Sequence, residues 1–209
     1  MKKEKSYMDV VFLLDKSTSM IGTEKDTIKG YNDYLKKFKD RNAKITTILF
    51  NHKCTMVTKR KEVKKIPKLT EKEYSVSGST ALLDALGKAI KYMERKKSKK
   101  VIFIITTDGY ENSSRTYTKK QIKEMIRNHR EWEFIYIGAD IDSYSEAMSI
   151  GIEQKNISNY IKTGRGIAKM FDSLYYACEE YDDEDQISSS WKEDLDIFVD
   201  KNINKVTED

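Results

Sequence analysis

The sequence predicts an α/β domain organised around a central parallel sheet. Residues 8–14, 101–107 and 132–138 are apolar runs that few polar side chains interrupt, as is typical of strands buried on both faces. Segments with apolar residues at helical spacing separate these runs, which is the order expected of consecutive strand, helix and strand units. One antiparallel edge strand and a C-terminal helix complete the expected architecture.

The first part of the chain alternates between strands and a helix. After the first strand, residues 23–40 carry the apolar spacing of a helix, and residues 44–50 are β-branched and apolar, as in a second strand. Residues 54–58 form a short strand that could pair back onto it as a hairpin. The charged run 59–65 cannot be buried, so we expect it in an exposed edge strand or a surface loop.

A second helix is expected after a loop that contains Gly78, since glycine permits a tight turn. Thr80 or the serine before it can cap this helix. The apolar strand 101–107 follows and ends at Asp108, just as the first strand ends at Asp15. Two central strands therefore terminate in a carboxylate.

The remainder of the chain continues the pattern. The expected elements are a helix at 118–130, a strand at 132–138, a short helix at 143–150, a short strand or turn at 156–160 and a helix at 163–181. Asp140 and Asp142 precede the short helix, and we expect them to cap it rather than to bind a ligand.

We expect one domain with an extension rather than two domains. A chain of 209 residues can bury one sizeable core, and we find neither an internal repeat nor a flexible linker. We place the domain at residues 1–182 and a C-terminal helical extension at residues 183–209. The extension is amphipathic between Trp191 and Val199, so it is expected to pack on the domain or on a partner.

The composition indicates a soluble protein with a very polar exterior. Charged residues make up 35% of the chain, against roughly 25% in average globular proteins. No run approaches the roughly 20 apolar residues that span a bilayer, and the N-terminal lysines lead straight into the first strand without a separate signal segment. We therefore expect no membrane association and a cytoplasmic location, with Cys54 and Cys178 as reduced thiols.

Oxygen donors gather at the predicted strand ends. The set consists of Asp15, Ser17 and Ser19 after the first strand, Thr80 at a helix start and Asp108 after another strand. Open α/β sheets usually bind ligands at the edge formed by the C-terminal ends of their strands. Oxygen donors without thiolate or imidazole suit Mg²⁺ or Mn²⁺ better than zinc, and two carboxylates with hydroxyls leave room for an outside ligand. The sequence therefore predicts a metal site made of these residues.

Three short motifs carry these donors. Asp-x-Ser-x-Ser follows an apolar strand, Gly-Ser-Thr-Ala-Leu opens a helix, and Thr-Asp-Gly follows another apolar strand. In order and approximate spacing they resemble the von Willebrand factor type A family and its metal-ion-dependent adhesion site, over residues 10–181. The resemblance implies a Rossmann-like fold with a doubly wound, mostly parallel sheet and helices on both faces, which agrees with the element order above.

The resemblance also implies a function. It implies that the donors hold Mg²⁺, or else Mn²⁺ or Ca²⁺, and that an Asp or Glu of a protein partner completes the coordination. The implied activity is binding rather than catalysis, and we expect it inside a bacterial or phage-related assembly. Tyr110, Glu111 and Asn112 follow Asp108 on the same face, so we expect them to contact the partner, since loops around a rigid site commonly carry recognition.

Two other functions stay open. A Mg²⁺-dependent phosphohydrolase of the haloacid dehalogenase type also has an aspartate after its first strand, but it needs a second aspartate two residues later, where Ser17 stands. The net charge of +5 allows a lysine-mediated nucleic-acid binder, although solvated surfaces explain the lysines better. Lys16 would weaken metal binding if it pointed inward.

The oligomeric state is left open, and we expect a protein partner rather than nucleic acid.

Overall fold

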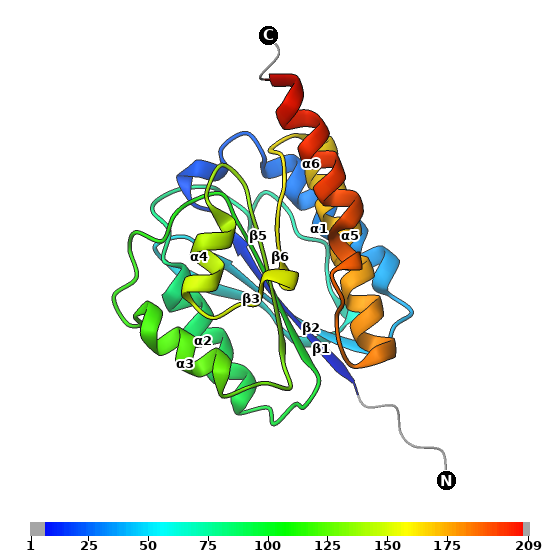
Figure 1. The fold of residues 1–209 in the computed structure, drawn as a ribbon. Coiled ribbons are helices and arrows are strands. Elements are labelled where there is room, and N and C mark those ends of the chain that lie inside the picture. Colours follow the sequence, from blue (N-terminus) through cyan, green and yellow to red (C-terminus); the bar gives the residue numbers. More distant parts are fainter. Residues whose placement is uncertain (1–6, 207–209) are drawn as a thin grey trace.

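The computed structural model describes residues 7–206 and places six strands in one sheet (Figure 1). The strands are β1 (Met8–Asp15), β2 (Ala43–Phe50), β3 (Cys54–Glu62), β4 (Val101–Thr107), β5 (Glu133–Gly138) and β6 (Ile157–Asn159). Their order is β3-β2-β1-β4-β5-β6, and neighbouring strands are parallel except for β2 with β3. The mostly parallel sheet with one antiparallel edge strand is therefore confirmed.

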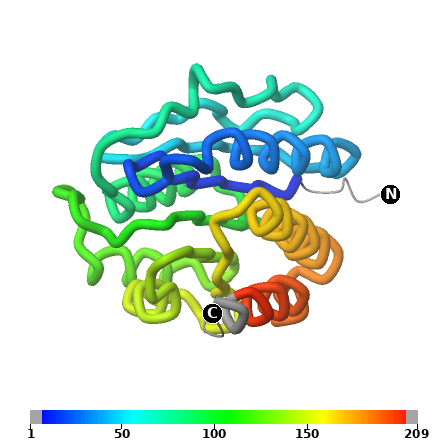
Figure 2. The backbone as a smooth tube through the Cα atoms, turned by 90° about the horizontal axis from the view of Figure 1, so that it is seen from above, coloured from blue at the N-terminus to red at the C-terminus, as the bar shows by residue number. Residues whose placement is uncertain are grey.

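Helices cover both faces of this sheet (Figure 2). Those in the described part of the chain are α1 (Glu24–Phe38), α2 (Leu82–Glu94), α3 (Lys119–Arg127), α4 (Ser143–Ser149), α5 (Gly164–Glu184) and α6 (Glu193–Val206). One face carries α1, α5 and α6, and the other carries α2, α3 and α4 (Figure 1). The helix α1 connects β1 to β2 on one face and α2 connects β3 to β4 on the other, so the sheet extends in both directions from β1 and the doubly wound fold is confirmed.

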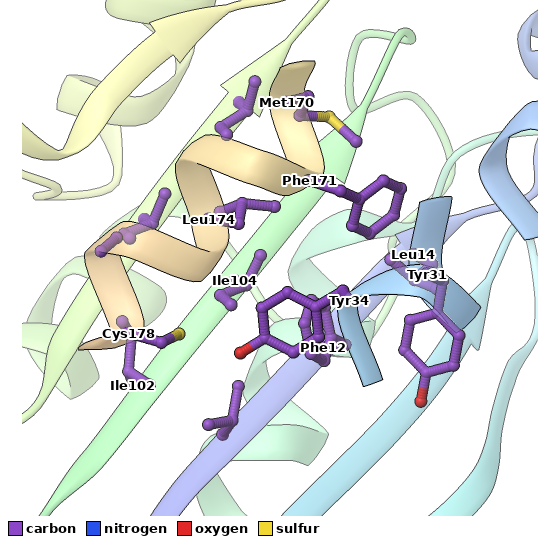
Figure 3. Close-up of a cluster of buried hydrophobic side chains, with 14 of the residues drawn as sticks. Phe12, Leu14, Tyr31, Tyr34, Ile102, Ile104, Met170, Phe171, Leu174 and Cys178 are labelled. Atoms are coloured by element: carbon purple, nitrogen blue, oxygen red, sulfur yellow. The ribbon is translucent and has the colours of Figure 1, made fainter. Parts of the chain in front are cut away.

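β1 is buried along its whole length and contributes to both hydrophobic cores. Phe12 and Leu14 point to the side of α1 and α5, whereas Val11 and Leu13 point to the side of α2 and α3. This alternation follows from the two-residue period of a strand. Figure 3 shows the first core, in which Phe12 meets Tyr34 of α1 edge-on with ring centroids 4.9 Å apart. Because both faces are covered, the strand needs no polar side.

The segment that begins at Trp191 packs on the rest of the molecule. The Trp191 indole is buried just ahead of α6, and its nitrogen donates to the backbone oxygen of Lys155 at 3.1 Å. Leu195 and Val199 of α6 are buried in the same hydrophobic cluster as the inner side of α5. The amphipathic pattern of this segment therefore corresponds to an apolar face that α5 and β6 cover.

The division into a domain at residues 1–182 and an extension at residues 183–209 stays a prediction. Residues 1–6 of the predicted domain and 207–209 of the predicted extension lie outside the part of the chain that the structure describes. Within residues 7–206, every helix is too short or too polar to cross a membrane.

The antiparallel edge strand β3 includes part of the charged run at residues 59–65. Residues 59–62 belong to β3, and Val63–Lys65 forms a single 3-10 turn. The pairing of β2 with β3 shifts in register around Thr47, and Arg60 on the other strand has a positive φ of 48°. The Arg60 guanidinium donates two hydrogen bonds to Asp9, at 2.8 and 3.0 Å. Since Asp9 is only 1% exposed, this pair neutralises a buried charge.

Candidate metal site

The carboxyl ends of β1 and β4 meet where the winding of the sheet reverses. β2 and β3 lie on one side of β1, while β4, β5 and β6 lie on the other. Open α/β sheets bind ligands in the crevice at this reversal. Asp15 is the last residue of β1 and Asp108 directly follows β4, so both carboxylates belong to this edge.

The Asp15 carboxylate is buried and held by two hydrogen bonds. The backbone N–H of Ser17 donates to Oδ1 at 2.7 Å, and Thr107 Oγ1 donates to Oδ2 at 2.6 Å. Burial raises the pKa of Asp15 to about 6, against the lowering effect of these hydrogen bonds, and the charge of Asp108 adds to the rise. A buried carboxylate beside a like charge gains from a cation that neutralises it.

Three hydroxyl groups converge beside Gly109. Ser17 Oγ and Ser19 Oγ lie 2.9 Å apart. A methyl group placed on Gly109 would stand 2.8 Å from Thr80 Oγ1, 3.0 Å from Ser19 Oγ and 3.6 Å from Ser17 Oγ. Glycine at position 109 therefore keeps open a small space that three oxygen donors surround.

The loops that carry these donors are tied to one another by backbone hydrogen bonds. The Thr80 N–H donates to Asn112 Oδ1 at 2.9 Å, and the Asn112 N–H donates back to the Thr80 carbonyl at 3.0 Å. The Thr18 N–H donates to the carbonyl of Gly78 at 2.9 Å. Gly78 has a φ of 76°, so the tight loop uses the conformational freedom expected of it. The three motifs therefore form one connected edge.

The expected side-chain cap on the helix after Thr80 does not form. α2 begins at Leu82, and its N-cap residue makes no side-chain hydrogen bond. Instead, Glu111 Oε2 accepts from the Leu83 N–H at 2.9 Å. A side chain from the loop after β4 thus accepts from a free N–H group of the first turn of α2. The prediction that Ser79 or Thr80 caps α2 is therefore wrong.

The Asp108 carboxylate is buried, with 0% of its side chain exposed, and its ion-pair partner is Lys162. Neither Asp108 oxygen accepts a hydrogen bond from a described residue. Lys162 Nζ lies 2.7 Å from Oδ2, at ion-pair distance but outside hydrogen-bonding angles, and it donates to the Ser19 carbonyl at 2.8 Å. Burial lowers the pKa of Lys162, but its contacts with Asp108 and Asp140 together outweigh burial and leave that pKa raised.

The donor set fits a hard divalent cation. Two carboxylates supply negative charge and three hydroxyls supply neutral oxygens, which are the ligand types that Mg²⁺ takes. The buried oxygens of Asp108 would gain most, because a buried charge without hydrogen bonds is costly. Residues 7–206 hold no group of three or more His, Cys, Asp or Glu side chains placed to bind an ion. A metal here must therefore rely on serine and threonine oxygens.

The residues expected to contact a partner take different positions. Tyr110 is 50% exposed and presents its ring at the surface. The Glu111 carboxylate accepts from the N–H groups of Ser113 and Ser114, at 2.9 and 2.7 Å, while Asn112 holds the neighbouring loop. Glu111 and Asn112 thus build the loop that carries Tyr110, whose hydroxyl accepts from the Asp142 N–H at 3.1 Å. A partner contact by any of the three stays a prediction.

Lys162 is the residue at this edge that the sequence analysis missed. The sequence places Lys16 next to Asp15 as a cation that would weaken metal binding if it pointed inward, whereas Lys162 comes from the turn between β6 and α5. Its position follows from the fold, since Lys162 comes after β6, which lies parallel to β5, and therefore lies at the same sheet edge as Asp15 and Asp108.

Asp140 and Asp142 have separate roles. Asp142 accepts a hydrogen bond from the Ser145 N–H at 2.9 Å and caps α4, as expected. Asp140 has a positive φ of 55°, and its carboxylate lies 3.4 Å from Lys162 Nζ. The expectation that Asp140 also caps the helix is therefore wrong, because its carboxylate faces the lysine.

Known proteins share this architecture. The family profile of the von Willebrand factor type A domain matches residues 9–174. Similar solved structures include proximal thread matrix protein 1 from the mussel byssus with a zinc-occupied MIDAS motif (17% identity, TM-score 0.60), the PilB minor pilin from Streptococcus sanguinis (10%, 0.66) and a von Willebrand factor type A structure from Catenulispora acidiphila (16%, 0.61). The matches cover 82%, 85% and 82% of this chain, but only 45%, 62% and 42% of theirs. Curated protein sequences give no match.

Fold and site together define a doubly wound α/β domain with an oxygen-donor site where its winding reverses. Because the family profile matches most of the chain, we conclude that this protein belongs to the von Willebrand factor type A domain family. The three structural neighbours are under 25% identical and support the fold alone. The resemblance inferred from the three motifs is therefore confirmed.

Proposed function

We propose that this chain is a non-enzymatic protein-binding module that depends on a divalent metal ion. The residues that would hold the ion are Asp15, Ser17, Ser19, Thr80 and Asp108. The observation that carries the proposal is the convergence of three hydroxyls beside Gly109, next to two buried carboxylates. A bound ion would supply an open coordination position, and a carboxylate of the partner would fill it.

The charges at the site favour an acidic side chain as the incoming ligand. The two carboxylates of the chain balance a divalent ion, and Lys162 adds a positive charge next to Asp108. An Asp or Glu of the partner would therefore meet the bound ion and the Lys162 ammonium, which also pairs with Asp140 at 3.4 Å, and form charge-assisted contacts with them. This balance supports a partner carboxylate over a neutral ligand.

Two exposed apolar side chains stand on the loops that carry the donors. Ile21 is 63% exposed and comes two residues after Ser19, and Tyr110 is 50% exposed and comes two residues after Asp108. Binding surfaces commonly combine such anchors with a polar contact. We therefore propose that Ile21 and Tyr110 contact the partner around its metal-bound carboxylate, while Glu111 and Asn112 hold the loop of Tyr110 in place.

Mg²⁺ is the ion that we propose, with Mn²⁺ and Ca²⁺ as alternatives. Each of these hard cations prefers oxygen ligands such as those gathered here. The MIDAS motif of the mussel byssus protein is occupied by zinc in its structure. The donor set of this chain lacks the thiolate and imidazole groups that zinc sites usually contain, which supports Mg²⁺.

The proposal is tested by metal-dependent capture with a charge-neutral variant. Ser19→Ala combined with Thr80→Ala removes two hydroxyl donors and keeps both carboxylates, so any effect reflects coordination rather than net charge. The immobilised wild type and double variant are exposed to a lysate of the source cells in Mg²⁺ or in EDTA, and retained proteins are identified by mass spectrometry. Ser145→Ala, at an exposed position of α4, is the matched control.

We expect the wild type and the control to retain the same partner in Mg²⁺ alone, and the double variant to lose it. Replacing the contacting Asp or Glu of that partner by its amide should then abolish capture. Equal retention in EDTA, or by a folded double variant, would contradict the proposal. Circular dichroism establishes that each variant is folded.

A further inference from the structure

Lys162 brings a protein cation into the proposed metal site. Its ammonium lies 2.7 Å from Asp108 Oδ2, 2.8 Å from the Ser19 carbonyl oxygen and 3.4 Å from Asp140 Oδ2. Ser19 and Asp108 belong to two of the motifs that carry the metal donors. One ammonium group therefore joins the loops that follow β1, β4 and β5.

The backbone around Lys162 is fixed, whereas its side chain is able to move. The Tyr160 N–H donates to the Gly138 carbonyl at 2.9 Å, and Thr163 caps α5 by accepting from the Gly166 N–H at 3.1 Å. These bonds hold the chain on both sides of the lysine. The Lys162 side chain is 23% exposed and has a flexible four-carbon stem, so its ammonium can change position without a change in the loop.

Asp108 cannot bind the Lys162 ammonium and a divalent ion equally well at the same time. Its carboxylate is fully buried, and Lys162 is the cation that contacts it among the described residues. A divalent ion that draws on the same carboxylate would stand close to the ammonium, and like charges repel strongly in a partly desolvated site. Asp140 offers the ammonium another partner nearer solvent, since the Asp140 side chain is 69% exposed.

We infer that Lys162 competes with the divalent metal for Asp108 and thereby lowers the metal affinity of this site. The inference rests on the proposed metal-dependent function. When the metal binds, the ammonium gives up Asp108 and moves toward Asp140; when the metal leaves, the ammonium neutralises the buried carboxylate again. The metal then binds only the fraction of molecules in which Lys162 is displaced, so its apparent affinity falls to that fraction of the intrinsic affinity.

A weakened site has a consequence for partner binding. Metal and partner carboxylate favour each other, because each adds to the coordination or charge balance that the other needs. With Lys162 holding the intrinsic affinity down, the metal becomes firmly bound only when the partner supplies its carboxylate. The lysine would thus make metal uptake conditional on the partner.

The test is a Mn²⁺ titration of the full chain, with free Mn²⁺ measured by electron paramagnetic resonance. Lys162→Met keeps an unbranched stem and removes the charge. We expect it to bind Mn²⁺ about tenfold more tightly than the wild type, since an ammonium that occupies Asp108 about nine-tenths of the time costs that factor. Lys100→Met is the matched control, because Lys100 is 18% exposed, is paired with Asp185 and precedes the opposite end of β4.

The outcomes separate this inference from the proposed function. Tighter binding by Lys162→Met alone supports the inference, and unchanged or weaker binding by the folded variant overturns it while leaving the metal site in place. If neither protein binds Mn²⁺, both the metal site and the inference fail. If only Lys162→Met binds, competition is established and the metal-dependent function of the unmodified chain is refuted.

A second measurement uses the wild type and is independent of the folding of any variant. Lysines are acetylated briefly with acetic anhydride, with and without Mn²⁺, and the modified sites are quantified by mass spectrometry. Displacement from Asp108 should raise the labelling of Lys162 severalfold on metal binding and leave that of Lys100 unchanged. Labelling of Lys162 that stays constant or falls as Mn²⁺ binds would overturn the competition.

Discussion

Thr107 Oγ1 donates a 2.6 Å hydrogen bond to Asp15 Oδ2, and this bond joins the carboxyl ends of the two central strands. Leu14 pairs with Thr106 in the β1–β4 ladder, so Thr107 stands beside Asp15, and both are fully buried. The Thr107 hydroxyl also accepts from the Gly109 N–H at 3.2 Å. One side chain therefore orients the first carboxylate and the loop that borders the hydroxyl donors.

Replacing Thr107 by valine is expected to destabilise the fold by about 1–3 kcal/mol, because valine keeps the shape but leaves a buried Asp15 oxygen without its donor. Affinity for Mn²⁺ should fall as well, since Asp15 loses its orientation. Urea unfolding measures the first effect and Mn²⁺ titration the second. Thr106→Val, on the same strand, is the control. Equal losses in both variants would argue against the role of the Thr107 bond.

Gly109→Ala should block the metal site while preserving the fold. The added methyl group would stand 2.8 Å from Thr80 Oγ1 and 3.0 Å from Ser19 Oγ, which are positions a carbon atom rarely occupies beside oxygen. We expect Mn²⁺ affinity to fall by at least about tenfold, because a misplaced donor set loses coordination. Ser145→Ala, at an exposed position of α4, is the control. If Gly109→Ala binds Mn²⁺ as tightly as the wild type, the three hydroxyls do not coordinate the ion.

The fold and the order of the donors could be predicted because their signals are local. β1 and β4 are buried on both faces, so each reads as a mainly apolar run, and an aspartate ends β1 and directly follows β4. The polar residues that follow them must then share one edge of the sheet. The edge strand was harder to delimit, because the charges of residues 59–62 suit an exposed strand and a loop equally well.

The features that the sequence did not indicate depend on contacts between distant segments. Lys162 reaches Asp108 only because β6 lies parallel to β5 and ends at the same edge. Likewise, Glu111 supplies the acceptor at the start of α2, so the local cap expected at Thr80 is unnecessary. Propensity and periodicity describe neighbours in sequence, and neither records which loops meet in space.

Removing the Arg60 side chain should destabilise the sheet edge. Arg60→Ala would leave Asp9, which is 1% exposed, as a buried and unpaired carboxylate. We expect a loss of about 3 kcal/mol, toward the low end for a broken buried pair because Arg60 itself is 26% exposed. Denaturant unfolding measures the loss, and adding Asp9→Asn should recover part of it by removing the charge. A double variant no more stable than Arg60→Ala would contradict this account.

Cys178 should make the fold sensitive to alkaline pH. Its thiol is fully buried in α5, among the apolar side chains that Figure 3 shows, and burial raises the pKa of Cys178 to about 12. In the unfolded chain the thiol titrates near its ordinary value of about 8.5. Between these two values the unfolded state loses a proton that the folded state keeps, so stability falls as pH rises.

The stability that Cys178 contributes is therefore complete below about pH 8.5 and decreases by up to about 1.4 kcal/mol for each pH unit above it. Buried tyrosines also titrate at high pH, so the informative quantity is the difference in unfolding free energy between wild type and Cys178→Ala. This difference, measured by urea unfolding from pH 7 to pH 10.5, should be constant at first and then shift in favour of the variant. Parallel curves over the whole range would mean that the thiol ionises equally readily in the folded chain.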